Sequence, residues 1–175
     1  MAEFEPAFEP MLKHEGGFPG YANDRHDSGG ETLAGISRRH WNGWKGWPIV
    51  DAAKKSPGFP GNLRENTALL NDVKEFYRRN FWLPVYNEIC NQDVANWVFD
   101  KGVNMGTNQA HRLLQRALQI PDDGIFGKQT LKHTNAHNAD RLLIKMKTEA
   151  VEFYRKLADK NPSQAKFLKS WMARV

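Results

Sequence analysis

The segment HEGGFPGYANDRHDSGGETLAGIS, residues 14–37, decides the fold near the N-terminus. Apolar residues before it recur at helical spacing, which predicts a short amphipathic helix over about Phe4–Glu15. Gly16 and Gly17 then end this helix, because glycine readily adopts the left-handed conformation found at helix C-termini. Residues 18–35 are rich in Gly, Asp, Asn and Ser, which predicts turns and a small hairpin rather than a helix.

Most of the remaining chain is predicted to be helical. Thr67 can cap a helix that Pro84 ends or kinks, and Asp93 can cap another that ends before Gly106. Apolar residues at helical spacing over residues 142–157 predict a long amphipathic helix. The expected fold class is mainly α, with one Gly-rich loop or β-hairpin insert near the N-terminus.

Two stretches between these helices are less regular. Residues 36–41 are expected to form one or two helical turns. Residues 44–62 contain three prolines and several glycines, which predicts an ordered loop.

The composition is that of a soluble globular protein. The chain has 175 residues, of which 40% are hydrophobic and 26% charged, and this length suits one domain with at most a small appendage. No run approaches the ~18 apolar residues of a membrane-spanning helix, so no stable membrane insertion is expected. A single cysteine, Cys90, excludes an internal disulfide and a Cys-based zinc site. Residues 1–11 are acidic and lack the pattern of a secretory signal, so synthesis in the cytoplasm without a signal peptide is expected.

Positive charge is concentrated near the C-terminus. The net charge is +5, and residues 128–175 carry 11 Lys and Arg against 4 Asp and Glu. Such an excess favours an anionic partner, such as nucleic acid, a lipid surface or a wall polymer, and the alternative is a set of solvated helix faces. The chain has no recognition-helix pattern and no basic strand interleaved with aromatic residues, so a nucleic-acid partner is not expected.

Glu15 is the leading candidate for a catalytic residue. It lies at the predicted C-terminal end of a helix, where unpaired carbonyl groups place a partial negative charge. Partial burial beside Phe18 or a tryptophan would add to this effect, and both favour the protonated carboxyl that a general acid needs. The alternative is an ordinary exposed glutamate that precedes a Gly-Gly helix stop.

A second acidic group is available in the loop that follows. A glycosidase needs one protonated carboxyl for the leaving oxygen and usually a second, ionised group across the sugar. Asp24 and Asp27 lie in this loop, and Glu31 and Thr32 close it. Sequence spacing gives no separation between the carboxyls, so retaining and inverting chemistry both stay open. Asp27 can equally be a turn former.

The runs at residues 14–18, 27–32 and 35–37 together resemble glycoside hydrolase family 108, the N-acetylmuramidases. That family's pattern reads E-G-G-Y, D-P-G-G-E-T and Y-G-I-S. This chain differs from it in having Phe18, Ser28 and Ala34 in place of tyrosine, proline and an aromatic residue, and none of these differences removes a carboxylate.

The resemblance implies a lysozyme-like helical fold, peptidoglycan as substrate and Glu15 as the catalytic acid. Glu15, Asp24 and Thr32 are also similar to the phage-type lysozyme pattern, with seven residues instead of five in the last gap. Asp24, or Asp27, would then stabilise the cation-like transition state or position water. Thr32 would help to hold that water.

The second half of the chain resembles the peptidoglycan-binding half that follows the catalytic half in such proteins. The matching runs are residues 99–106, 114–115, 123–130 and 167–175. The expected organisation is therefore a muramidase region over residues 1–92 and a peptidoglycan-binding helical region over residues 93–175, packed into one compact unit.

Two tryptophans are candidates for sugar binding, because aromatic faces stack on the apolar faces of sugar rings. Trp44 and Trp47 have glycine and proline neighbours, which predicts a surface loop, although either can instead fill the core. Asp100 and Asn104, at i and i+4 of a predicted helix, can line a groove opposite Glu15 or hold two helices together.

No metal or cofactor is expected. His133 and His137 have i, i+4 spacing, but no third ligand of suitable type follows at helical spacing.

The sequence thus predicts a monomeric N-acetylmuramidase that hydrolyses the β-1,4 bond between N-acetylmuramic acid and N-acetylglucosamine in peptidoglycan glycan strands. A phage or prophage endolysin fits, as does a bacterial muramidase that assists secretion. Either would reach the periplasm or cell wall through a holin, lysis or dedicated export. A lytic transglycosylase and a non-catalytic peptidoglycan-binding module stay open as alternatives.

Overall fold

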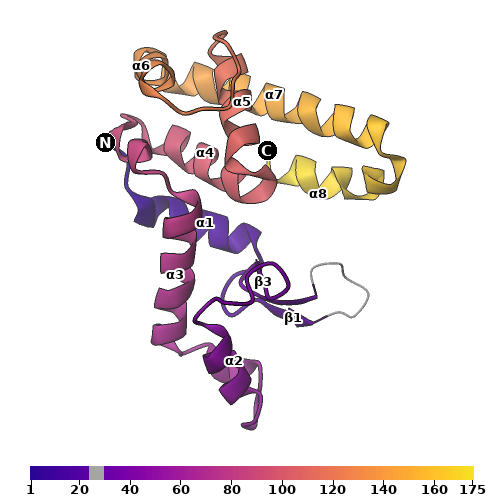
Figure 1. The fold of residues 1–175 in the computed structure, drawn as a ribbon. Helices are drawn as coiled ribbons and strands as arrows, with labels where there is room; N and C mark the ends of the chain where they lie inside the picture. Colours follow the sequence, from indigo (N-terminus) through magenta and orange to yellow (C-terminus); the bar gives the residue numbers. More distant parts are fainter. Residues whose placement is uncertain (24–29) are drawn as a thin grey trace. The chain divides into compact units, whose positions relative to one another are not determined.

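The computed structural model describes residues 1–23 and 30–175, and it confirms the expected fold class. The described residues are mainly helical, with one small sheet near the N-terminus (Figure 1). They form two compact units. Phe8–Trp82 forms the sheet-bearing unit, and Met1–Ala7 together with Leu83–Val175 forms the helical unit. The functional division expected at residues 1–92 and 93–175 stays a prediction.

Helix α1, Phe4–His14, ends at the glycine pair as expected. Gly16 and Gly17 have φ angles of 96° and 75°, and the Gly17 amide donates to the carbonyl of Leu12 over 2.8 Å. This is the six-to-one closure that commonly ends a helix at glycine. Glu15 is thereby fixed at the last turn of α1, with its amide donating to the carbonyls of Met11 and Leu12, both at 3.1 Å.

The insert forms a three-stranded antiparallel sheet in the order β1-β2-β3. Its strands are β1 (Tyr21–Asn23), β2 (Glu31–Leu33) and β3 (Ile36–Ser37). Ala34 and Gly35 connect β2 to β3, and both have positive φ angles, 48° and 80°, as tight hairpin turns require. The prediction of helical turns over residues 36–41 is wrong at Ile36 and Ser37, because these two residues form strand β3.

Helix α2, Trp47–Ala53, lies inside the stretch that was expected to be a loop. Pro48 occupies its first turn. Backbone N–H groups in the first turn have no acceptor within the helix, so a proline there breaks no hydrogen bond and is compatible with the start of a helix. A 3-10 turn over Gly61–Leu63 follows.

Helix α3, Thr67–Phe81, completes the sheet-bearing unit. The side chain of Asn66, one residue before the expected cap, accepts the Leu69 amide at 2.9 Å. The unit buries a continuous apolar core of Phe8, Leu33, Ile36, Trp47, Val50, Leu69, Val73 and Tyr77.

The helical unit is built around three helices that contact one another: α4 (Gln92–Met105), α5 (Thr107–Ala117) and α7 (Ala139–Lys160). The side chain of Asn91, rather than Asp93, caps α4 by accepting the Val94 amide at 3.0 Å. The remaining elements are two 3-10 turns, Pro84–Glu88 and Pro162–Phe167, and the helices α6 (Lys128–Ala136) and α8 (Leu168–Ala173). In Figure 1, α8 lies beside the C-terminal part of α7, which it contacts. No helix in the described ranges is long and apolar enough to cross a membrane.

Gln115 of α5 organises the turn before α6. Its buried side-chain amide donates to Asp123 Oδ1 at 2.7 Å and accepts the Gly124 amide at 2.8 Å. Loss of this amide would leave a buried N–H without its acceptor, which typically costs about 1–3 kcal/mol.

Gln115→Ala is therefore expected to lower the free energy of unfolding by about 1–3 kcal/mol, as measured by urea denaturation. Gln129→Ala, at an exposed position of α6, is the control and should change it by less than about 0.5 kcal/mol. Equal losses in the two variants would contradict the structural role of Gln115.

Candidate active site

The carboxyl group of Glu15 lies against the turn between β2 and β3. A Cβ atom at Gly35 would stand 2.6 Å from Glu15 Oε2 and 2.7 Å from the Tyr77 hydroxyl. Real Cβ atoms do not approach other atoms so closely, so the glycine makes room for both groups. The end of α1, the hairpin turn and α3 therefore meet at Gly35, and Glu15 is half-buried there.

Tyr77 of α3 fixes this turn. Its ring is 2% exposed, and its hydroxyl donates to the carbonyl of Ala34 over 2.7 Å. The amide of the same residue, Ala34, donates to the carbonyls of Pro19 and Gly20, at 3.0 and 3.1 Å. These bonds hold a non-glycine residue at positive φ, a conformation that costs free energy unless its surroundings enforce it. The surface against which Glu15 lies is thus rigid.

Sequence reasoning did not identify Tyr77 or the role of Gly35. Gly35 was visible as part of the G-I-S run, but its contact with Glu15 depends on the hairpin. Tyr77 lies 62 residues from Glu15 and reads in the sequence as one core residue of an amphipathic helix.

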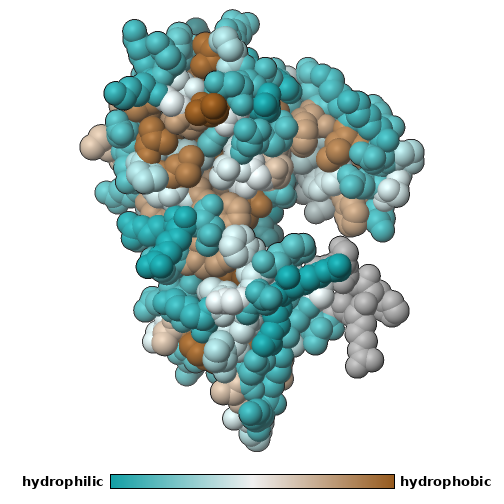
Figure 2. Space-filling view, in the orientation of Figure 1, coloured by the Kyte–Doolittle hydropathy of each residue, from teal (hydrophilic) through white to brown (hydrophobic). Residues whose placement is uncertain are grey.

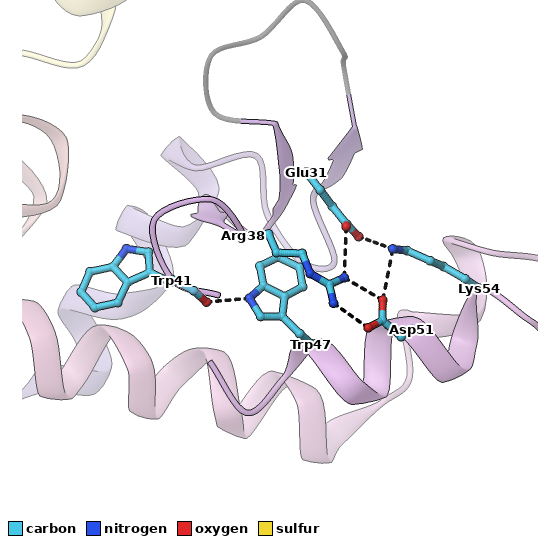
Figure 3. Close-up of polar contacts among 6 residues, drawn as sticks. All are labelled: Glu31, Arg38, Trp41, Trp47, Asp51 and Lys54. Carbon is cyan, nitrogen blue, oxygen red and sulfur yellow. Dashed lines mark hydrogen bonds and ion pairs between the residues drawn. The ribbon is translucent and has the colours of Figure 1, made fainter. Parts of the chain in front are cut away.

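A salt-bridge network fastens the sheet to α2 (Figure 3). The Arg38 guanidinium binds both carboxylate oxygens of Asp51, at 2.7 and 2.6 Å, and also Glu31 Oε2 at 3.1 Å. Lys54 Nζ lies 2.5 Å from Glu31 Oε1. The guanidinium also lies over the ring of Trp47, 5.0 Å from its centroid. Glu31 is therefore committed to two cations that hold β2 and α2 together.

This network sets the protonation of its own members. The hydrogen bonds from Arg38 hold the pKa of the Asp51 carboxyl well below its ordinary value of 3.8, and those to Asp51 raise the pKa of Arg38. Lys54 has a raised pKa despite some desolvation, because Glu31 and Asp51 accept from it. All three groups stay charged at neutral pH.

The structure describes only one of the other three candidates, Thr32. Asp24 and Asp27 lie outside the described residues. Thr32 is half-buried in β2, where it pairs with Ala22 of β1 and with Ser37 of β3. The roles expected for Asp24, Asp27 and Thr32 stay predictions.

Trp44 and Trp47 are buried, so the exposed side chains expected of a surface loop are not found, and sugar binding by them stays a prediction. Trp47 is 2% exposed and donates its indole N–H to the carbonyl of Trp41 at 2.8 Å. Trp44 is 9% exposed and packs edge-on against Trp47, with ring centroids 5.2 Å apart. Neighbouring glycine makes this burial possible, because a Cβ atom at Gly46 would collide with the Trp44 ring. The exposed tryptophan of this stretch is Trp41.

Asp100 and Asn104 of α4 have partners inside the helical unit. Asp100 is paired with Lys101 at 3.2 Å and with Arg174, whose Nη2 lies 3.0 Å from Oδ1. Asn104 Oδ1 accepts the hydroxyl of Tyr154 of α7 at 2.6 Å. These contacts favour the alternative in which the two residues hold helices together, and sugar binding by them stays a prediction.

The described ranges contain no group of three His, Cys, Asp or Glu side chains that could hold a metal ion. His137 Nδ1 lies 2.9 Å from the carbonyl of His133, one turn back along the chain.

The lowered pKa of Asp51 makes part of the stability pH-dependent. Since the folded pKa lies below the ordinary value, the contribution of Asp51 is present above about pH 4 and is lost as pH falls further. Asp51→Asn is expected to cost roughly 0.2–1 kcal/mol at pH 7, because the pair is partly exposed. Thermal melting of both proteins from pH 7 to pH 2 measures this. A difference that stays constant with pH would contradict the role of the network.

Comparison with known proteins identifies the family of the chain and agrees with its fold. The glycosyl hydrolase 108 family model matches residues 8–106, and the predicted peptidoglycan domain model matches residues 109–175. The structure of Brucella abortus SagA is similar with a TM-score of 0.63 at 22% identity, over 98% of this chain and 88% of that chain. No curated protein matches the chain. Because the first family model covers more than half of the residues, the chain belongs to the glycosyl hydrolase 108 family, and with its peptidoglycan domain it is a peptidoglycan hydrolase.

Proposed function

We propose that the protein is an N-acetylmuramidase that hydrolyses the β-1,4 bond between N-acetylmuramic acid and N-acetylglucosamine. The observation that supports this most strongly is the placement of Glu15. Its half-buried carboxyl follows the last turn of α1 and lies against a hairpin turn that Tyr77 holds in place. A general acid must be held within hydrogen-bond reach of the proton acceptor in a fixed geometry, and this frame supplies that rigidity.

In this mechanism Glu15 donates its proton to the glycosidic oxygen as the bond to the anomeric carbon breaks. The sugar then carries cation-like charge, and water adds to the anomeric carbon while its proton leaves to a base. We assign the stabilisation of this charge, or the positioning of water, to Asp24 or Asp27, with Thr32 helping to hold the water. Glu31 is unsuited to that role because Arg38 and Lys54 already bind its oxygens.

The helical unit is proposed to hold the enzyme on its substrate. Its longest helix, α7, exposes Arg141, Lys145, Lys147, Arg155, Lys156 and Lys160, and the surface over this helix is mostly hydrophilic in Figure 2. Exposed cations attract an anionic wall polymer over a Debye length of about 8 Å at physiological salt. We further propose that the protein acts as a monomer in the periplasm or cell wall. It would be an endolysin released by a holin or lysis, or a muramidase that reaches the wall by dedicated export.

Glu15→Gln is expected to reduce the release of reducing ends from purified sacculi by at least about 100-fold, because general acid catalysis contributes roughly 10²–10⁴-fold. Glutamine keeps the size of the side chain but has no acidic proton. Glu65→Gln, an exposed position in the same unit, is the matched control and should retain activity. Far-UV circular dichroism and thermal melting check that both variants fold. Retained lysis by a folded Glu15→Gln protein would reject the assignment.

Mass spectrometry of the digested sacculi separates hydrolysis from the lytic transglycosylase reaction. Hydrolysis leaves muramic acid at the reducing end, whereas transglycosylation leaves an anhydromuramic acid that has lost the elements of water. Anhydro ends as the main product would replace the proposed reaction while leaving Glu15 as the acid.

A further inference from the structure

A second candidate site lies in the sheet-bearing unit, between residues 40–45 and one face of α3. The cavity has a volume of about 440 Å³, which falls within the range of about 300–1,000 Å³ typical of small-molecule sites. We call it the Trp41 pocket. None of its lining residues is Glu15, Gly35 or Tyr77. Phe76 lines the pocket whereas the next residue, Tyr77, bonds the hairpin turn, and adjacent helix residues point about 100° apart. The pocket is therefore lined by a face of α3 other than the one from which Tyr77 bonds the hairpin turn.

Trp41 presents an aromatic surface that is held in place before any ligand arrives. The side chain is 39% exposed, and its ring packs edge-on against Phe76 with centroids 4.8 Å apart. The Trp41 amide donates to the carbonyl of Ser37 at 2.9 Å, and the Trp41 carbonyl accepts from the buried indole of Trp47. Figure 3 shows the Trp41 ring pointing away from the salt-bridge network around Arg38. Such fixation reduces the entropy lost on binding.

Charges in the pocket neutralise one another. Lys45 Nζ lies 2.7 Å from Asp72 Oδ1, and Arg79 is paired with Glu75 one turn away on α3. An anionic or cationic ligand would have to compete with these internal pairs. A neutral ligand gains hydrogen bonds from the same groups without breaking them, so the electrostatics favour a polar, uncharged molecule.

The remaining lining groups suit a sugar. Asn42 and Asn80 line the pocket together with Trp41. The Asn80 side-chain amide nitrogen donates to the carbonyl of Phe76 at 2.8 Å, and its oxygen can accept from a ligand. A pyranose ring has an apolar face that stacks on an aromatic side chain, and its hydroxyl and acetamido groups bond to amides and charged side chains at its rim.

We propose that the Trp41 pocket is a second saccharide-binding site that takes an N-acetylhexosamine unit of a glycan strand. The choice of an N-acetylated sugar rests on the proposed function, whereas the existence of the site rests on the pocket. The site would hold a strand at residues that the candidate active site does not use, and so keep the enzyme on insoluble substrate between cleavage events.

The test is an NMR titration of ¹⁵N-labelled Glu15→Gln protein with tetra-N-acetylchitotetraose. The Glu15→Gln background prevents cleavage, so the readout is binding alone. Saturable shifts are expected at the Trp41 indole N–H, identified by its absence in Trp41→Phe, and at the Asn80 side-chain amide. In the same background, Trp41→Ala should weaken the binding read at Asn80 by roughly tenfold, and Trp41→Phe should retain most of it. Ile144→Ala, an exposed apolar position in the helical unit, should leave the affinity unchanged.

An absence of saturable shifts at Trp41 and Asn80, or an affinity that Trp41→Ala leaves within twofold, would overturn the proposal. Thermal melting shows whether Trp41→Ala folds. Should it not, Asn42→Ala takes its place, and the affinity is read at the Trp41 indole: a loss supports the site, and an affinity within twofold overturns it. The titration and the product analysis test different claims. An N-acetylmuramidase without this site would show no binding in the titration but would still give hydrolysis products. A protein that binds at this site but gives anhydro products would keep the proposed site and contradict the proposed hydrolysis.

Discussion

The hydrogen bond from the Tyr77 hydroxyl to the carbonyl of Ala34 joins α3 to the hairpin turn against which Glu15, the candidate acid, lies. It fixes a two-residue turn at positive φ, and the glycine of that turn leaves the space that Glu15 Oε2 occupies. Loss of the bond would leave a buried carbonyl without its donor and loosen the hold of α3 on the hairpin turn. The carboxyl of Glu15 would then lose the rigid surface that defines its position. Catalysis depends on the placement of an acid as well as on its presence, because a misplacement of about 1 Å can cost about 10²-fold in rate.

The same small sheet is fastened on two sides by different kinds of interaction. Tyr77 secures its β2–β3 turn through a buried hydrogen bond. Arg38 secures β2 to α2, because it binds Glu31 of β2 and forms a partly exposed bidentate ion pair with Asp51 of α2. The two fastenings respond differently to conditions. The buried hydrogen bond is insensitive to salt and to pH in the acid range. The ion pair weakens when salt is added and when the pH falls. A three-stranded sheet with so few residues needs such external supports.

The sequence predicted the features that depend on local chemistry. The Gly16–Gly17 stop, the irregular insert and the candidate acid were all readable from the residues around Glu15, and the family resemblance from the same run proved correct. Helix starts were displaced by one or two residues, because Asn66 and Asn91 compete with Thr67 and Asp93 as caps. The features that were missed depend on distant partners. Burial of Trp44 follows from packing against Phe76 of α3, and Trp47 in turn packs against Trp44. Asp100 contacts Arg174 only when the chain has folded back over 74 residues.

The most direct test of this account compares two glycine substitutions that strain the backbone alike. Gly35 and Gly58 have φ angles of 80° and 83°, but a Cβ atom collides with Glu15 and Tyr77 only at Gly35 and meets nothing within 4 Å at Gly58. The rate of reducing-end release from sacculi should fall at least about tenfold in Gly35→Ala and stay near that of the unchanged protein in Gly58→Ala, with both variants folded. Equal rates in the two variants would contradict the claim that the turn positions the catalytic acid.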